Sequence, residues 1–260
     1  MERRQLHRLS ITLFVLLGIA LVALAIADML IGTESIPVRE IISSLWGDVS
    51  VEYETIIFKI RMPKVIVAIV AGMALSASGL LMQTLFRNPL AGPYVLGINS
   101  GASLGVALFT LAMPMIAAQT PWLYDMGLTG MAWIGSAAIL LMVMALSRRI
   151  RNISVILILG MMLGSAISAV VGILQYMGTE ESLKAFVVWT MGSLSNVTTD
   201  QLYIFVPVVV VGLMLSLVSV KSLNMLLLGE SNARTLGLRV GMSRTIIFLA
   251  TTLLAGTVTA

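Results

Sequence analysis

Apolar residues fill long stretches of this sequence, and several stretches are long enough to cross a lipid bilayer. A membrane-spanning helix needs roughly 20 mostly apolar residues. Such stretches lie at residues 11–31, 65–86, 94–115, 126–146, 153–177 and 201–220, and a seventh begins near Thr245 but is shorter than a full span. The pattern predicts an all-α fold, a polytopic transmembrane helical bundle.

The composition agrees with a membrane protein and removes several kinds of chemistry. Hydrophobic residues make up 58% of the chain and charged residues 11%, against about 25% charged residues in an average soluble domain. The chain has no cysteine and one histidine, His7. We therefore expect no disulfide, no thiolate or imidazole metal site and no histidine-based catalysis.

Charges between the apolar stretches predict the orientation of the chain. The basic residues of one side are Arg3, Arg4, Arg8, Arg87, Arg148, Arg149, Arg151, Lys221, Arg234, Arg239 and Arg244. The acidic residues of the other side are Glu34, Glu40, Asp48, Glu52, Glu54, Asp125, Glu180, Glu181 and Asp200. Because Lys and Arg favour the cytoplasmic side, we expect a cytoplasmic N-terminus. The first apolar stretch is too long for a signal peptide and is interpreted as a retained helix.

Arg61 and Lys64 are exceptions, because this orientation puts them on the acidic outer side. One interpretation is that both side chains snorkel at the outer end of the second helix. The other is that they form an electropositive spot for the carboxylates of a partner. Pro63, which is tolerated in a first helical turn, favours a helix boundary here.

Two proline-containing turns follow the second stretch and indicate a transporter. They are Asn88-Pro89 and Gly92-Pro93. Non-helical backbone near a bilayer is tolerated only where it is buried in protein or lines a watery cavity. The turns therefore predict a re-entrant segment.

Three separated motifs resemble the FecCD family of ABC-transporter permeases. They are RMPKVIVAIVAGMALSASGLLMQTLFRNPLAGPYVLGINSGASLG at 61–105, VVWTMGSLSNV at 187–197 and NMLLLGESNARTLGLRV at 224–240. The resemblance runs through the chain and implies a single transmembrane permease domain over residues 1–260, similar to type II importer permeases. It implies a place in the bacterial inner membrane and a cargo that is an iron-siderophore, haem or cobalamin.

The resemblance also implies partners. Two permease copies, expected to be identical, would form the pathway in the lipid bilayer, and an extracytoplasmic substrate-binding protein would deliver the cargo. A cytoplasmic ATPase subunit would bind ATP and magnesium, because this chain has no G-x-x-x-x-G-K phosphate-binding loop. We expect no cofactor in the chain itself, no enzymatic activity and no nucleic-acid partner.

One departure from the family pattern concerns length. Members of the family usually have ten spans, and their glycine-rich segment ending in Pro-His does not follow the seventh stretch here. The sequence is therefore expected to be truncated at its C-terminal side.

The segment Leu228–Gly237 lies in the longest cytoplasmic loop and carries glycines at both ends. The pattern predicts a short helix of about two turns, with Ser231 or Asn232 near its start. An amphipathic connector on the membrane would show the same pattern. The resemblance favours a coupling helix that docks into the ATPase, with Ala233 as a flat spot for close approach. The residues assigned to this contact are Gly229, Glu230, Ala233, Leu236 and Gly237.

Small and polar residues within the apolar stretches are candidates for the translocation pathway. Gly160, Gly164, Ser168 and Gly172 recur every four residues, which is typical of close helix packing but also of a pore lining. Polar groups in a membrane are costly unless they face a partner or water. By similarity to the family, Ser154 is an inner-gate residue, although a plain helix N-cap would explain it equally. The predicted pathway residues are Ser154, Gly160, Gly164, Gln83, Asn88, Asn99 and Ser100.

Two other kinds of function are alternatives to a permease. An ion-coupled secondary transporter needs a carboxylate near the bilayer midplane, and the one candidate, Asp28, lies near the outer interface. A membrane enzyme needs a cluster of His, Glu, Asp or Cys at one membrane face, which the sequence does not indicate.

Overall fold

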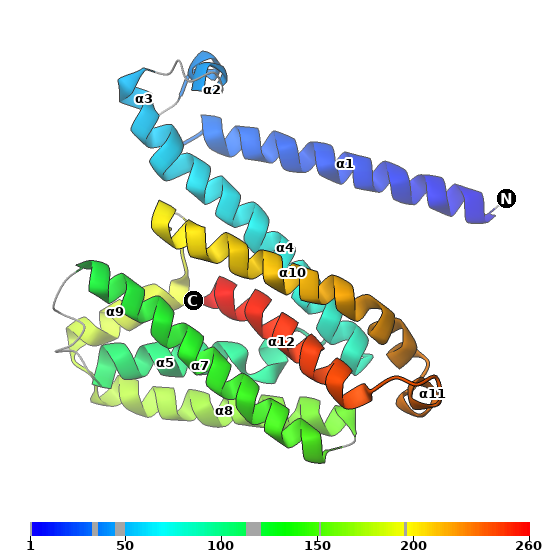
Figure 1. Ribbon diagram of the computed structural model, residues 1–260. Helices are drawn as coiled ribbons and strands as arrows, with labels where there is room; N and C mark the ends of the chain where they lie inside the picture. The colour runs from blue at the N-terminus through cyan, green and yellow to red at the C-terminus, as the bar shows by residue number, and fades with distance from the viewer. Residues whose placement is uncertain (1, 33–35, 45–49, 113–120, 151, 195–196) are drawn as a thin grey trace. The chain divides into compact units, whose positions relative to one another are not determined.

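The computed structural model describes residues 2–32, 36–44, 50–112, 121–150, 152–194 and 197–260. Within these ranges the chain forms helices and turns and no strand, so the predicted all-α bundle is confirmed (Figure 1). Six of the described helices are long and apolar enough to cross a membrane. The chain divides into two compact units, which are residues 1–69 with 194–202, and residues 70–193 with 203–260.

The first unit contains α1 (Glu2–Leu30), α2 (Val38–Ser44), α3 (Val51–Thr55), the π-helical turn η1 (Ile56–Arg61) and the beginning of α4 (Met62–Phe86). The sequence interpretation placed a loop at 32–64, and this is wrong for its second half. α3, η1 and α4 follow one another without a break, and the apolar span is Tyr53–Phe86. Pro63 lacks an N–H and would clash with a regular preceding turn, and the wide η1 turn directly before α4 accommodates it.

The second unit contains the rest of α4, the 3-10 turn η2 (Pro93–Leu96), α5 (Ile98–Ala107), the π-helical turn η3 (Leu108–Ala112) and α7 (Pro121–Arg149). It continues through α8 (Ile153–Met177), α9 (Glu180–Met191), most of α10 (Thr199–Leu227), α11 (Glu230–Thr235) and α12 (Val240–Thr259).

Two predicted spans of this unit need correction. The third, at 94–115, is interrupted by Gly97, whose φ of 75° ends η2 and leaves α5 with ten residues. This short, broken element fits the predicted re-entrant segment better than a full span. The seventh was expected to be short, but α12 has 20 residues. α12 begins at Val240, and its first turn is not part of an apolar run because Ser243 and Arg244 are polar.

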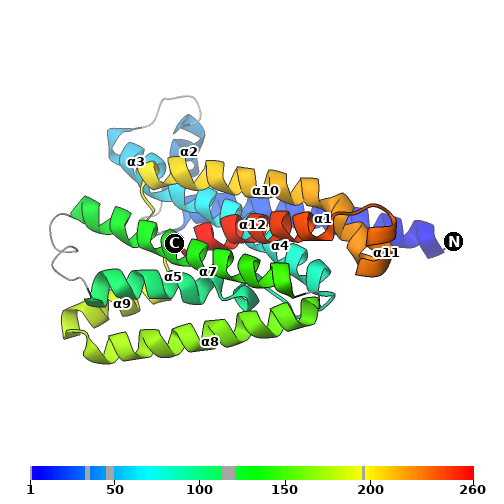
Figure 2. The same ribbon diagram turned by 60° about the horizontal axis from the view of Figure 1, so that its bottom comes forward.

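Glycines allow α5 to pack closely on α7. A methyl group added at Gly105 would overlap the carbonyl oxygen of Met131, and one added at Gly135 would overlap that of Gly101. α5 also packs against α8, and α12 packs against α7 and α5 (Figure 2). Such backbone contacts through small residues are the usual source of helix association in lipid.

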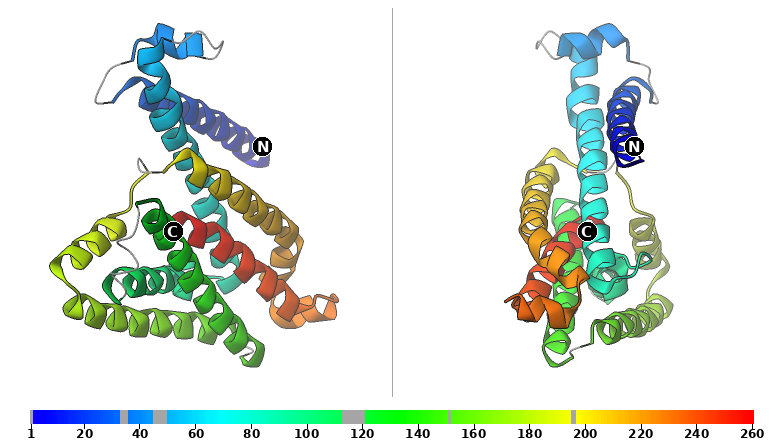
Figure 3. Two further views of the ribbon diagram at one scale, coloured as in Figure 1. Left: turned by 60° about the vertical axis from the view of Figure 1, so that its left-hand side comes forward. Right: turned by 90° about the vertical axis from the view of Figure 1, so that its right-hand side faces the viewer.

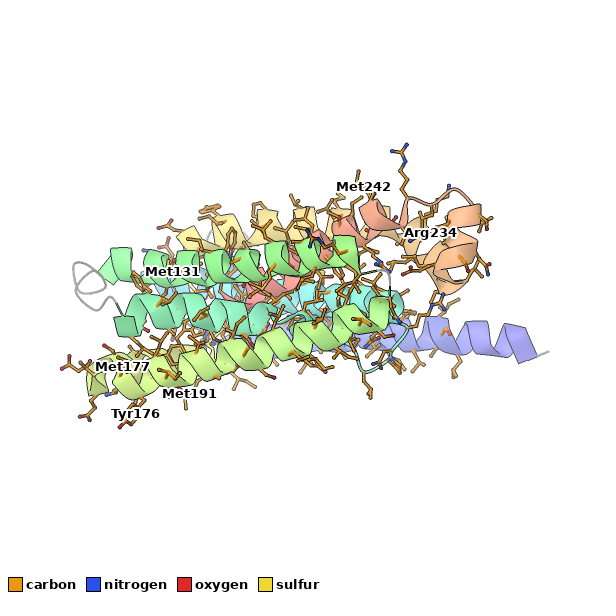
Figure 4. All side chains as sticks on the ribbon, turned by 90° about the horizontal axis from the view of Figure 1, so that it is seen from below. Met131, Tyr176, Met177, Met191, Arg234 and Met242 are labelled. Carbon is orange, nitrogen blue, oxygen red and sulfur yellow. The ribbon has the colours of Figure 1, made fainter. Side chains whose placement is uncertain are left out.

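The second unit has two distinct ends. The ends of α4, α7 and α10 lie with α11 and with the beginnings of α8 and α12, and we call this the α11 end. α9 and the end of α8 lie at the other extremity (Figure 3). In Figure 4, Arg234 and Met242 mark the α11 end, whereas Tyr176, Met177 and Met191 mark the opposite one. The predicted loops 87–93, 147–152 and 221–244 therefore share one end, as the orientation prediction required.

Candidate functional site

The predicted short helix at 228–237 is present as α11, between two glycines with left-handed backbone. Gly229 has a φ of 106° and Gly237 a φ of 85°, and L-residues with side chains adopt such values at a cost. α11 has six residues, and Gly229 is its N-cap without a side-chain bond. The expected role of Ser231 or Asn232 at the start is therefore wrong. Asn232 instead donates from Nδ2 to the Leu228 carbonyl at 2.8 Å, at the end of α10.

Ala233 is fully buried in the main hydrophobic cluster, with Leu226 and Val240. The interpretation of this residue as a flat spot for a partner's backbone needs correction, because its methyl group already faces the chain's own core. The surface that α11 presents is formed by other residues. Leu236 is 58% exposed, and Ser231, Asn232, Arg234, Thr235 and Gly237 are also exposed.

Arg244 connects α11 to two other elements. Its side chain is 5% exposed and pairs with the Glu230 carboxylate, which is 29% exposed. Its Nη1 donates to the Ile150 carbonyl at 3.2 Å, directly after α7. Glu230, predicted to contact the ATPase, is thus held by an internal partner in this structure.

Arg87 approaches the same region from the end of α4. Its Nη2 donates to the carbonyl of Leu226 in the last turn of α10. A methyl group added at Gly229 would lie 3.6 Å from that nitrogen. The start of α11 is therefore surrounded by polar contacts from Arg87 on one side and from the Arg244–Glu230 pair on the other.

Gly160 and Gly164 of α8 are buried against η2 and the start of α5. A methyl group at Gly160 would overlap the Val95 carbonyl oxygen, and one at Gly164 would lie 3.3 Å from the Ser100 hydroxyl. These contacts favour close packing for the two residues, and their role in the pathway stays a prediction. Gly172 differs, because it is exposed and a methyl group there would meet nothing within 4 Å.

The other pathway candidates fall into separate environments. The Thr259 hydroxyl donates to Asn99 Oδ1 at 3.2 Å, and Ser100 lies 3.5 Å from Ser168. Gln83 is exposed on α4. Asn88 shapes the turn after α4, since its Oδ1 accepts from Leu90 N at 2.9 Å. On α5, Asn99 thus contacts α12 and Ser100 contacts α8. A role in transport stays a prediction for these two residues, for Gln83 and for Asn88.

Ser154 is exposed in the first turn of α8. The alternative that Ser154 is the helix N-cap is wrong, because Asn152 occupies that position and accepts from Ser154 N at 2.9 Å. The role of Ser154 in an inner gate stays a prediction.

Arg61 and Lys64 both have partners within the first unit. Lys64 Nζ pairs with Asp28 at 2.6 Å, with both side chains 36% exposed. Arg61 is 7% exposed and donates from Nη1 to the Met29 carbonyl at 2.5 Å. Both residues tie the end of α1 to η1 and α4. Their role in docking the substrate-binding protein stays a prediction. The contact also gives Asp28 a structural partner.

Sequence reasoning missed Arg87, Arg244 and Thr259 as site residues. Both arginines fit the excess of basic residues that predicts orientation. That pattern does not indicate which groups their side chains contact. A signal was present for Arg244, which lies one helical turn inside α12 rather than in a loop. For Arg87 no signal in the sequence separates a loop charge from a bond to a distant carbonyl.

Comparison with known proteins identifies the class. The profile of the FecCD transport family matches residues 19–260, and the chain belongs to this family. It is 35% identical over 244 residues to the hemin transport system permease protein HmuU of Yersinia pestis, covering 94% of this chain and 71% of the relative. It is 31% identical over 250 residues to the molybdate import system permease protein MolB of Haemophilus influenzae, covering 92% of this chain and 71% of the relative.

A solved structure extends the likeness to three dimensions. It is an inward-facing conformation of a metal-chelate type ABC transporter, with a TM-score of 0.79 and 29% identity over 95% of this chain and 75% of that chain. With six candidate membrane helices, these relatives make the chain a multi-pass membrane protein of the ABC permease class. They give no support to the ion-coupled alternative.

Proposed function

We propose that this chain is the membrane-spanning permease subunit of an ATP-driven importer in the bacterial inner membrane. Two copies form the pathway, a cytoplasmic ATPase binds ATP and magnesium, and an extracytoplasmic binding protein delivers the cargo. ATP binding in the partner moves α11 and changes which side of the membrane the pathway opens to. The α11 end then faces the cytoplasm, where the N-terminus also lies.

The cargo class we favour is a metal chelate such as an iron-siderophore, haem or cobalamin. The likeness to HmuU and to the metal-chelate type transporter supports this choice. The likeness to MolB, named for molybdate, limits it, because identity near 30% accompanies different cargoes. The pathway candidates are small and polar residues that offer little charge for a specific ionic cargo.

The observation that carries the proposal is the surface of α11. A six-residue helix stands between two left-handed glycines, is anchored on its inner side by Ala233, and exposes Leu236 beside Arg234 and Thr235. Arginine is enriched at the energetic centres of protein interfaces, and Leu236 adds exposed apolar surface beside Arg234. The ATPase is the partner that a permease of this family meets through such a segment.

The test is co-purification of the ATPase with a charged variant of this surface. Leu236→Glu should leave the permease monodisperse in detergent and reduce ATPase recovery about tenfold, since a buried interfacial charge is costly. Met191→Glu is the matched control, because Met191 is 80% exposed and lies at the opposite end (Figure 4). Equal ATPase recovery with both variants would contradict the assignment of α11.

A further inference from the structure

We propose that Arg87 and Arg244 are positioning residues that connect α11 and the adjoining end of α10 to the α4–α5 turn, to α12 and to the α7–α8 turn, so that a displacement of α11 moves all of them. The inference rests on the proposed function, in which α11 meets the ATPase. It assigns Glu230 to an internal bond instead of a contact with the partner, and it adds two residues to the coupling machinery.

Arg244 connects α11 to α12 and to the turn after α7. It lies in the first turns of α12, is almost fully buried, and bonds both to Glu230 on α11 and to the Ile150 carbonyl after α7. A charge with so little access to water is strongly disfavoured unless it keeps its partners. α11 cannot therefore move away from α12 and the α7–α8 turn without exposing or replacing these bonds.

The Ile150 contact leads toward the predicted gate. Ile150 closes the last turn of α7 through its N–H bond to Leu146 at 3.1 Å. Two residues further on, Asn152 caps α8 by accepting from Ser154 N. A displacement of Arg244 therefore acts on Ile150, close to the first turn of α8, where Ser154 lies.

Arg87 connects the end of α4 to the end of α10. Its backbone conformation is unusual. Its φ is 50°, and it is the one non-glycine residue with positive φ in the described part of the chain. The N–H of Asn88 bonds to the Gln83 carbonyl at 3.0 Å, as in the glycine-terminated helix ends that usually place glycine at this position. A side chain here costs conformational energy, and such strain points to a function of the residue. The function we assign is the bond to the Leu226 carbonyl at the end of α10, which also accepts from the N–H of Gly229, the N-cap of α11.

The end of α4 also touches α12. The rings of Phe86 and Phe248 lie with centroids 6.5 Å apart. Both arginines therefore act on a connected set of elements at the α11 end, and neither needs to contact the ATPase.

The experiment measures uptake per ATP hydrolysed in vesicles that contain the complete transporter. Arg87→Gly relieves the left-handed strain while removing the bond, so we expect unchanged thermal stability, full ATPase recovery and about a tenfold lower transport-to-hydrolysis ratio. Arg244→Gln should lower the same ratio. The exchanged pair Glu230→Arg with Arg244→Glu should recover part of it. Arg239→Ala, which removes an exposed charge at the same end, is the control and should keep the wild-type ratio.

The outcomes separate this inference from the function on which it rests. A wild-type chain that does not recover the ATPase contradicts the proposed function itself. A wild-type chain that transports, with Arg87→Gly equal to it in transport per ATP, overturns the inference alone. If Arg244→Gln does not fold, Arg87→Gly still decides, because glycine is the residue that this backbone position favours.

Discussion

α1 and α12 differ in a way that a soluble protein would reverse. The apolar window of α1 has a mean hydropathy of 2.8 and no buried residue, whereas that of α12 has a mean hydropathy of 1.3 and is 61% buried. In water the more apolar helix would be the more buried. In a bilayer, lipid solvates apolar side chains as well as a protein core does, and helices associate through small and polar residues instead.

The two helices also differ in their polar contacts. α12 carries Arg244 near its start and Thr259 near its end, and both bond to other elements of the second unit. α1 is joined to η1 and α4 by the contacts of Asp28 and Met29 at one end. These contacts of α12 thus lie on the least apolar of the six candidate membrane helices.

The largest expected effect comes from enlarging a small residue in the α5–α7 contact. Gly135→Leu should destabilise the protein by about 3 kcal/mol or abolish folding, because its side chain would overlap the Gly101 carbonyl. The measurement is denaturant unfolding in detergent micelles. Gly130→Leu on the same helix is the control and should unfold like the wild type, since a methyl group there meets nothing within 4 Å. Equal losses at both positions would mean that α5 and α7 do not cross at these glycines.

An intermediate effect should separate α12 from α1 directly. Leu254 of α12 is fully buried and Leu17 of α1 is 65% exposed. Leu254→Ala should cost about 1–3 kcal/mol, mainly through the cavity it leaves, and Leu17→Ala should cost almost nothing. The same unfolding titration measures both. A larger loss at Leu17 would contradict the contrast between the two helices.

How far the sequence predicts this structure depends on which property a residue reports. Apolar length predicted most of the helices, because the bilayer imposes it. It failed at α5, where Gly97 breaks the helix, and at the start of α12, where Arg244 and Ser243 are polar. The regularly spaced glycines of α8 pack closely at Gly160 but not at Gly172. Periodicity shows which residues share a helix face, but not which element covers that face.

Charged residues were the least predictable from the sequence. Orientation rules treat every Lys and Arg alike, yet Arg244 is buried, Arg87 bonds to a carbonyl and Lys64 pairs with Asp28. These contacts join residues 14 to 139 positions apart. A single sequence gives the sign of such charges but not the partner that folding brings to them.

The smallest expected effect concerns the Lys64–Asp28 pair. Asp28→Asn should lower stability by about 0.5 kcal/mol, because an ion pair with both side chains one-third exposed is largely screened. Thermal unfolding at low and high salt measures it, and the loss should shrink as salt rises. A loss of several kcal/mol, independent of salt, would mean that this pair is buried more deeply than the structure describes.

Labelling of single cysteines shows directly whether α11 forms the proposed contact with the ATPase. The chain has no native cysteine, so Thr235→Cys on α11 and Tyr176→Cys at the opposite end each provide one exposed thiol. Reaction with a membrane-impermeant maleimide in detergent is measured with and without the ATPase. We expect ATPase binding to slow labelling at position 235 at least about tenfold and to leave labelling at position 176 unchanged. Equal labelling of position 235 with and without bound ATPase would contradict it.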